Sequence, residues 1–144
     1  MIKISVCDDD EGQLTFFKQC FMGYNEKHEE KIEANFYQSV QSLLNEKKFS
    51  PDVYFLDIEL QDGNGLKLAG KIRTRNPQIP IVFITSHEEF MPEAFQVHAY
   101  QYLNEKKNAQ AVENVLNQLA DYFSEQNQIF SFQTYGEMIS LDCR

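Results

Sequence analysis

The feature of this sequence that most constrains its fold is a repeated alternation between short apolar runs and amphipathic stretches. The apolar runs are IKISVC (2–7), IEANFY (32–37), VYFLD (53–57), IPIVFIT (79–85) and AYQYL (99–103). Each run is followed by a stretch that carries apolar residues at helical spacing. Strands that alternate with helices in this way form parallel sheets covered on both faces, with right-handed crossovers. The sequence therefore predicts an α/β fold, a doubly wound five-stranded parallel sheet flanked by helices.

The helical stretches have recognisable faces and start signals. They are GQLTFFKQCFMGY (12–24), SVQSLLNE (39–46), GLKLAGKIR (65–73), EEFMPEAF (88–95) and a long segment from Asn108. Ser39 is a candidate N-cap for the second helix. The long segment carries one apolar stripe, formed by Val112, Val115, Leu116, Leu119 and Phe123. We therefore expect this last helix to pack along the sheet.

The pattern changes beyond about Gln128, which bears on domain organisation. A chain of 144 residues is about one domain's worth. The stretch IFSFQTYGEMISLDCR alternates apolar and polar residues around YGE, which predicts a hairpin with no helix after it. A lone hairpin is marginal by itself. We expect a first domain over residues 1–126, and a linker and first hairpin of a second, truncated β-rich domain over residues 127–144.

Composition excludes several classes of function. The chain has 22 acidic residues against 13 lysines and arginines, a net charge of −9, which would repel a phosphate backbone, so we expect no nucleic-acid binding by this chain alone. Its three cysteines (Cys7, Cys20 and Cys143) are an odd number without metal-ligand spacing, which suits a reducing compartment. No apolar run approaches the ~20 residues that cross a membrane, and Met1 leads into IKISV without a leader. The sequence therefore predicts a soluble, cytoplasmic protein that does not insert into a membrane.

Acidic and hydroxyl side chains stand where several of the predicted strands end. Asp8 and Asp9 follow the first strand, Asp57 ends the third and Thr85 ends the fourth, whereas Asp10 is better placed to cap the first helix. The carboxyl ends of parallel strands meet at one edge of a sheet, where ligands of such folds bind. Carboxylates that crowd together need a cation, and an all-oxygen set with room for water suits Mg²⁺. The sequence therefore predicts a magnesium-dependent acidic pocket.

Within that pocket Asp57 has the position of a nucleophile. A carboxylate held beside a divalent ion can attack a phosphoryl group and form an aspartyl-phosphate. Thr85 could donate a hydrogen bond to a phosphoryl oxygen, and the loop QDGNG (61–65) supplies flexible backbone beside the site. The residues thus indicate phosphoryl acceptance on Asp57.

These motifs resemble the receiver domain of two-component response regulators, over about residues 1–126. The matching segments are VCDDD, DVYFLDIELQDGNGLKLAGKIR, PIVFITSHEE and AYQYL, in the order and at the spacing of that family. The segment ITSHEEFMPEAFQVHAYQYL, followed by FSFQTYGEMISL, resembles the corresponding sequence of the LytTR (LytR/AlgR-like) class. In that class a receiver is joined to a β-rich DNA-binding domain. The resemblance implies a flavodoxin-like receiver fold over residues 1–126 and the first hairpin of a LytTR-type domain over residues 127–144.

The resemblance also implies roles for individual residues. Asp57 would be the phosphoacceptor, and Thr85 and Tyr102 the switch residues. The ligands of Mg²⁺ (or Mn²⁺) would be Asp8, Asp9, Asp57 and the backbone carbonyl of Glu59. The implied function is regulatory rather than enzymatic: a histidine kinase phosphorylates Asp57, and the receiver controls an attached DNA-binding domain in transcription regulation. Phosphorylation would act through the face of the fourth helix, fifth strand and fifth helix, which also implies a homodimer contact there.

One position departs from the family pattern. Receivers carry a lysine three residues after the aromatic of the fifth strand, usually followed by proline, and here Glu105 stands at the lysine position. Lys106 comes one residue late, and a shift of one residue in an extended segment points a side chain to the opposite face. A local bulge could still turn Lys106 inward. Because of Glu105, the sequence does not decide whether phosphorylation controls this domain.

Two alternative functions follow from these residues. The first is a pseudo-receiver that works as a dimerisation or docking module without phosphorylation, for which Glu105 is the best evidence. The second is a metal-dependent phosphohydrolase that uses Asp57 and Glu59 as an acid pair. The DxDxT pattern of haloacid-dehalogenase-like enzymes would require threonine where Gln61 stands and normally lies on the first strand, so this function ranks last.

Overall fold

The computed structural model describes the backbone of residues 1–104 and 108–142, and the side chains of residues 1–104 and 108–127. The strands are β1 (Ile2–Cys7), β2 (Ile32–Tyr37), β3 (Val53–Asp57), β4 (Glu59–Leu60), β5 (Gly63–Asn64), β6 (Ile81–Ile84) and β7 (Gln101–Leu103). The helices are α1 (Glu11–Lys27), α2 (Val40–Leu44), α3 (Gly65–Arg75), the 3₁₀ turn η1 (Glu88–Phe90), α4 (Met91–Gln96) and α5 (Ala109–Asp142).

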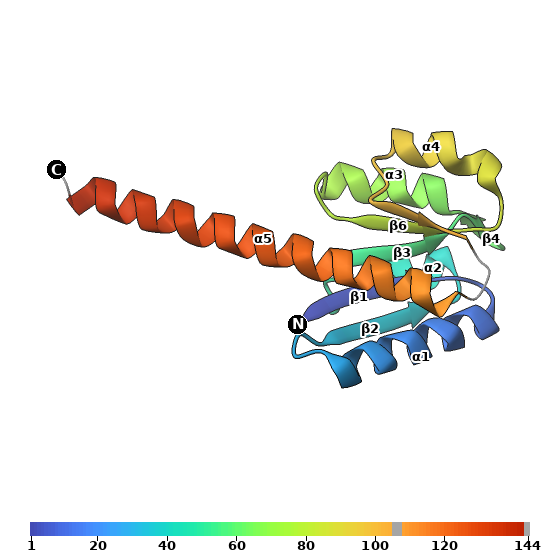
Figure 1. The fold of residues 1–144 in the computed structure, drawn as a ribbon. Coiled ribbons are helices and arrows are strands. Elements are labelled where there is room, and N and C mark those ends of the chain that lie inside the picture. Colours follow the sequence, from blue (N-terminus) through green and yellow to red (C-terminus); the bar gives the residue numbers. More distant parts are fainter. Residues whose placement is uncertain (105–107, 143–144) are drawn as a thin grey trace.

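The main sheet has five strands in the order β2-β1-β3-β6-β7, and every neighbouring pair is parallel. Helices α1 and α5 pack on one face, and α2, α3 and α4 pack on the other (Figure 1). This is the strand order of flavodoxin-like doubly wound folds. The predicted fold class is therefore confirmed, and each of the five predicted strands is present.

Helices α1, α2 and α3 each begin with a side-chain cap that the sequence supplies. Asp10 Oδ1 accepts from Gly12 N at 2.9 Å at the start of α1. Ser39 Oγ accepts from Ser42 N at 3.0 Å before α2, which confirms its predicted role as an N-cap. Asn64 Oδ1 accepts from Leu66 N at 2.7 Å before α3. Each cap satisfies an amide that the first helical turn leaves without an intrahelical partner.

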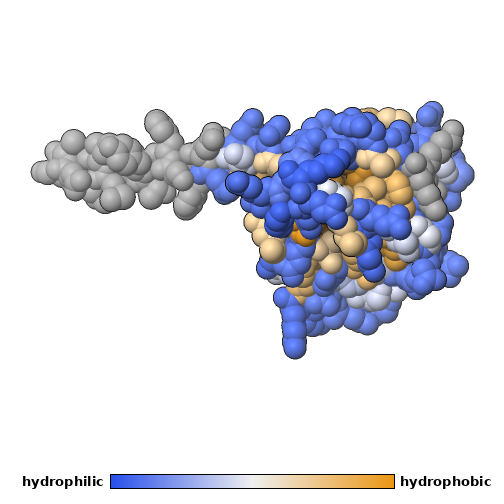
Figure 2. Space-filling model, turned by 60° about the horizontal axis from the view of Figure 1, so that its bottom comes forward, coloured by the Kyte–Doolittle hydropathy of each residue, from blue (hydrophilic) through white to orange (hydrophobic). Residues whose placement is uncertain are grey.

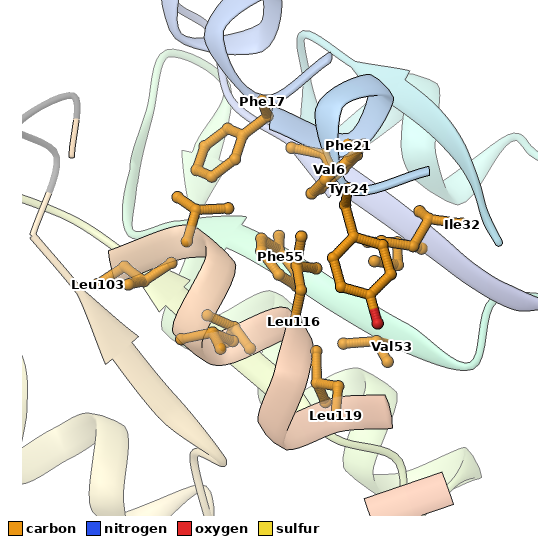
Figure 3. Close-up of a cluster of buried hydrophobic side chains, with 14 of the residues drawn as sticks. Val6, Phe17, Phe21, Tyr24, Ile32, Val53, Phe55, Leu103, Leu116 and Leu119 are labelled. Carbon is orange, nitrogen blue, oxygen red and sulfur yellow. The ribbon is translucent and has the colours of Figure 1, made fainter. Parts of the chain in front are cut away.

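The larger hydrophobic cluster lies between the sheet and the α1–α5 layer (Figure 3). Phe55 of β3 is fully buried at its centre, and its ring meets the rings of Phe17 and Phe21 edge-on, with both centroid separations 5.8 Å. Leu116 and Leu119 of α5 close the cluster from the other helix. Edge-to-face aromatic pairs add about 1 kcal/mol each beyond the area they bury. The predicted apolar stripe of the last helix is thus part of the core.

A second cluster lies on the opposite face of the sheet. Leu56 of β3 and Phe83 of β6 are fully buried, and they share this cluster with Leu68 and Ala69 of α3. Side chains alternate between the two faces along a strand, so Phe55 and Leu56 point to opposite layers. Because both faces are covered, the central strands read as continuous apolar runs in the sequence.

The end of the chain differs from the sequence prediction. A linker and first hairpin were expected over residues 127–144, whereas α5 continues as one helix to Asp142 and extends beyond the body of the domain (Figure 1). A helix satisfies its backbone hydrogen bonds within itself, whereas a two-stranded hairpin is marginal without further strands to pair with. Within the described residues neither sheet includes this segment. The hairpin prediction is therefore corrected for residues 128–142, and the predicted domain boundary stays a prediction.

The surface in Figure 2 is largely hydrophilic, with hydrophobic side chains visible in a hollow. A cavity of about 260 Å³ lies between α1 and α5, where Gly23 leaves room beside Phe16 and Cys20. Among the described helices, none combines the length and the apolar character needed to span a bilayer.

Candidate functional site

The candidate site lies where the strand order of the sheet reverses, between β1 and β3. Cys7 pairs with Leu56, so Asp8 follows β1 directly beside Asp57, the last residue of β3. On the other side Asp57 pairs with Ile84, which places Thr85 next to it at the end of β6. Ligands of open parallel sheets bind at such a reversal, beyond the carboxyl ends of the strands. The structure thus brings Asp8, Asp57 and Thr85 to one edge, as predicted from the sequence.

Three carboxylates converge at this edge. Asp8, Asp9 and Asp57 each offer an oxygen, and these oxygens all lie within 4.8 Å of one another. Asp8 and Asp57 are buried, with 0% and 3% of their surface exposed, and Asp9 is half-buried. Carboxylates this close and this buried repel one another unless a cation lies among them, and oxygen ligands are those Mg²⁺ prefers. The donor set therefore fits a magnesium site.

Backbone amides orient all three carboxylates. The bonds run to Asp8 Oδ1 from Asp10 N (2.9 Å), to Asp9 Oδ2 from Gln61 N (3.0 Å) and to Asp57 Oδ1 from Glu59 N (3.3 Å). The first and third join residues two apart and form within a local turn. The bond to Asp9 joins residues 52 apart, so it depends on where the segment around Gln61 lies. Carboxylates held in this way lose little freedom when they bind a cation.

Thr85 and Tyr102 both form hydrogen bonds with the backbone of His87. Thr85 is buried, and its Oγ1 accepts from His87 N at 3.1 Å. The Tyr102 hydroxyl donates to the backbone oxygen of His87. The β6–α4 loop is therefore held by a hydroxyl at the end of β6 and by the half-buried aromatic of β7.

The Glu59 side chain does not join the carboxylate cluster and is exposed. Its Oε2 lies 3.2 Å from His87 Nε2, and the other ring nitrogen of His87 lies 3.3 Å from Glu89 Oε1. The sequence did not predict the pair of Glu59 and His87, because Glu59 of β4 and the β6–α4 connection lie far apart in the chain and only the fold brings them together. The backbone of Glu59 stays beside Asp57, through the amide bond described above.

Residues 59–64 form a short antiparallel hairpin, β4–β5, where the sequence indicated only a flexible loop. Asp62, in the turn of this hairpin, accepts from Val40 N at 3.0 Å and from Gln41 N at 3.1 Å. These hydrogen bonds lower the pKa of Asp62 below its ordinary value. The contacts of Asp62 were not predicted from the sequence, although a turn residue followed by glycine is a signal for such a hairpin.

Cys7 lies beside the acidic edge and is fully buried. Burial, and after it the nearby charges of Asp62, Asp8, Asp57 and Asp9, raise the pKa of Cys7 to about 12. The group therefore stays a neutral thiol at ordinary pH, unlike a thiolate metal ligand.

We predict that Cys7 resists alkylation in the folded protein. At pH 8 iodoacetamide should leave Cys7 unmodified, because the thiolate is the reactive form and the side chain is covered. Modification should appear once guanidinium unfolds the chain. Peptide mass mapping checks this, with the half-buried Cys20 as the internal comparison. Rapid native modification of Cys7 would show that β1 opens at this edge.

Two of the predicted site residues, Glu105 and Lys106, lie outside the described residues. The expectation that Glu105 replaces the usual lysine, and that Lys106 is displaced by one position, stays a prediction from the sequence.

Comparison with known proteins agrees with this fold. Residues 4–117 match the model of the response regulator receiver domain, so the chain belongs to the response regulator receiver domain family. This family is regulatory rather than catalytic: its domains interact with histidine kinases and output domains and bind Mg²⁺ in an acidic pocket.

Its curated relatives include response regulators of the LytR type. An uncharacterized response regulatory protein of Yersinia pestis is 30% identical over 122 residues, which cover 83% of this chain and 49% of the relative. The sensory transduction protein LytR of Staphylococcus haemolyticus is 28% identical over 131 residues, or 89% of this chain and 49% of the relative. The chain thus spans about half the length of the curated relatives it matches.

Solved receiver structures share the fold at low sequence identity. The BeF₃-activated DrrB receiver domain matches with a TM-score of 0.70 at 20% identity, covering 84% of this chain and 98% of that one. The response regulator TrrA of Thermotoga maritima, solved with Mg²⁺-BeF, matches with a TM-score of 0.69 at 21% identity, covering 83% and 99%. At these identities the likeness supports the fold alone.

Proposed function

We propose that this chain is a phosphoacceptor receiver in which Asp57 accepts a phosphoryl group from a histidine kinase. The observation that carries the proposal is the convergence of the oxygens of Asp8, Asp9 and Asp57 within 4.8 Å at the reversal of the sheet. Asp8, Asp9, Asp57 and the backbone carbonyl of Glu59 would hold the cation, Mg²⁺ or Mn²⁺. A bound Mg²⁺ supplies positive charge that offsets the charges of the carboxylates and of the phosphoryl group.

The reaction is an in-line displacement at phosphorus. A carboxylate oxygen of Asp57 forms the new P–O bond while the bond from phosphorus to the donor's imidazole nitrogen breaks, and the electron pair leaves with the imidazole. The hydrogen bond from Glu59 N to Asp57 Oδ1 helps to orient the attacking carboxylate. The product is an aspartyl-phosphate on Asp57.

Thr85 and Tyr102 are proposed to transmit the change. Thr85 Oγ1 can turn to donate to a phosphoryl oxygen on the neighbouring Asp57, and it would then release His87 N. His87 is also the residue to which Tyr102 donates. Phosphorylation would therefore rearrange the β6–α4 loop and reach the face of α4, β7 and α5.

This output face is where we expect control of a partner. In a response regulator of the LytR type, it would alter contacts with an attached DNA-binding domain, and so transcription, or the formation of a homodimer. With a net charge of −9 the chain is not expected to bind nucleic acid by itself. We place the protein in the cytoplasm, where kinase and DNA target are both accessible.

Phosphorylation of the Asp57 carboxylate tests this function. After incubation with Mg²⁺ and acetyl phosphate, the intact mass of the protein should rise by one phosphoryl group, and Asp57→Ala should show no rise. Asp52→Asn is the matched control, because Asp52 lies just before the opposite end of β3 and accepts from Lys3 N at 2.9 Å. This control should be phosphorylated as the wild type is. Uptake that persists in Asp57→Ala would place the acceptor elsewhere.

A second candidate function rests on Glu105. If the wild type binds Mg²⁺ but gains no phosphoryl group, the domain is a pseudo-receiver that acts as a dimerisation or docking module. Glu105 would then add negative charge where phosphoryl oxygens require a cation. Glu105→Lys should in that case restore phosphorylation, measured by the same mass shift.

A further inference from the structure

The position of Asp9 depends on the β4–β5 hairpin. Asp8 and Asp57 are oriented by amides two residues along their own chain segment. Asp9 is oriented by Gln61 N, at 3.0 Å, from the turn of the hairpin. A displacement of that turn would therefore release Asp9 while it left the other two carboxylates in place. The position of the Asp9 carboxylate in the cation site therefore depends on the position of this turn.

Asp62 anchors the same turn on its other side. Its two carboxylate oxygens accept separately from the first two amides of α2, Val40 N at 3.0 Å and Gln41 N at 3.1 Å. Contact with α2 is close, since a Cβ added to Gly63 would lie 3.0 Å from Val40 Cγ2. The pKa of Asp62 is lowered by these bonds, so the acceptor is the charged carboxylate at neutral pH. Charged acceptors make the stronger hydrogen bonds.

We propose that Asp62 is a positioning residue for the cation site, which it serves by fastening the hairpin that orients Asp9 to the start of α2. This inference rests on the proposed cation site. The connection runs from the amides of α2 through the Asp62 side chain to the adjacent Gln61 amide and the Asp9 carboxylate. Coupling of this kind is reciprocal. Cation binding at Asp9 must therefore stabilise the contact between the hairpin and α2 by the same factor by which that contact favours binding.

The experiment measures Mn²⁺ affinity from the electron paramagnetic resonance signal of free Mn²⁺. Asp62→Ala should weaken binding about 10-fold, near the lower limit for groups that orient metal ligands. Asp62→Asn keeps one acceptor oxygen, so its Mn²⁺ affinity should fall less than that of Asp62→Ala. Glu11→Gln is the charge control, because Glu11 is an exposed carboxylate in the turn after Asp8 and Asp9, and its binding should stay near that of the wild type. Far-ultraviolet circular dichroism checks that each variant folds.

A second readout separates positioning from stability. Amide exchange at Val40 and Gln41, followed by NMR, should slow when Mg²⁺ is added to the wild type. In Asp62→Ala these amides should exchange rapidly with or without Mg²⁺. If the contact between Asp62 and α2 only stabilises the fold, amide exchange at Val40 and Gln41 in the wild type should not change when Mg²⁺ is added.

The outcomes distinguish this inference from the proposed function. A wild type that binds no Mn²⁺ would overturn the cation site itself. Normal binding by the wild type with equal affinity in Asp62→Ala would overturn only the role of Asp62. Equal losses in Asp62→Ala, Asp62→Asn and Glu11→Gln would show an effect of net charge and would also contradict positioning.

Discussion

Gly65→Ala is expected to destabilise the domain by about 3 kcal/mol, because the new methyl group has no space. The added Cβ would overlap the backbone oxygen of Asp57 and lie 2.9 Å from both the Asp57 carbonyl carbon and Ile58 Cα. Backbone atoms at the end of a central strand cannot rotate away as a flexible side chain could. Gly65 N also donates to Ile58 O at 2.8 Å, which holds the start of α3 against β3. Urea denaturation would measure the loss.

The same substitution at Gly70 is the control. Gly70 lies in the middle of α3, and an added Cβ there meets no atom within 4 Å. Gly70→Ala should stabilise the protein by about 0.5–1 kcal/mol, because alanine has the higher helix propensity. If Gly65→Ala lowers the free energy of unfolding and Gly70→Ala raises it, the effect at Gly65 comes from the contact with Asp57. A loss below about 0.5 kcal/mol at Gly65 would show that the β3–α3 turn adapts readily.

Gly65→Ala should also impair phosphorylation. Relief of the overlap requires the backbone of Asp57 to move, and the carboxylate moves with it. The initial rate of the mass increase with acetyl phosphate should fall about 10-fold or more, since misplacement of a reacting group by about 1 Å can cost 100-fold. A normal rate in a destabilised Gly65→Ala would show that α3, rather than β3, absorbs the displacement.

Phe55→Ala is expected to cost about 3–5 kcal/mol, a large share of the stability of a domain this size. Phe55 is fully buried, and its removal would leave a cavity between the sheet and the rings of Phe17 and Phe21. Neighbours on a strand and two helices cannot collapse fully into that space. The midpoint of urea unfolding should fall accordingly.

Phe95→Ala provides the comparison for Phe55. Phe95 of α4 keeps 61% of its surface exposed. Truncation there should change the free energy of unfolding by less than about 0.5 kcal/mol. Similar losses at Phe55 and Phe95 would contradict the packing described for the α1–α5 face.

Much of the fold was predictable because both faces of the sheet are covered. Strands such as Val53–Asp57 therefore contain continuous apolar residues, and helices such as α1 show one apolar face. The hairpin β4–β5 was not predicted, since strands of two residues are too short for any periodicity to show. The prediction of a linker and first hairpin over residues 127–144 was wrong where α5 continues to Asp142. Alternation there indicated a strand, but a strand requires a partner.

Part of the candidate site was also predictable from the sequence, and part was not. Asp8, Asp9, Asp57 and Thr85 were predictable because each stands at a strand end, and parallel strands bring such ends together. The pairs that His87 makes with Glu59 and Glu89 were not predictable from the sequence, and neither was the attachment of Asp62 to α2. Those contacts are made by exposed polar side chains of a short hairpin and of the β6–α4 connection, where the hydrophobic pattern carries no information.

The order of strands and helices, the family, and the acidic residues that reach one edge of the sheet all follow from the amino-acid sequence alone. These properties follow from local periodicity and from residue identity at strand ends. The hydrogen bond from Gln61 N to Asp9, and those that fasten Asp62 to α2, became known only from the folded structure. Such bonds depend on distances of about 3 Å between segments 21 or more residues apart, and these distances exist only after the chain has packed.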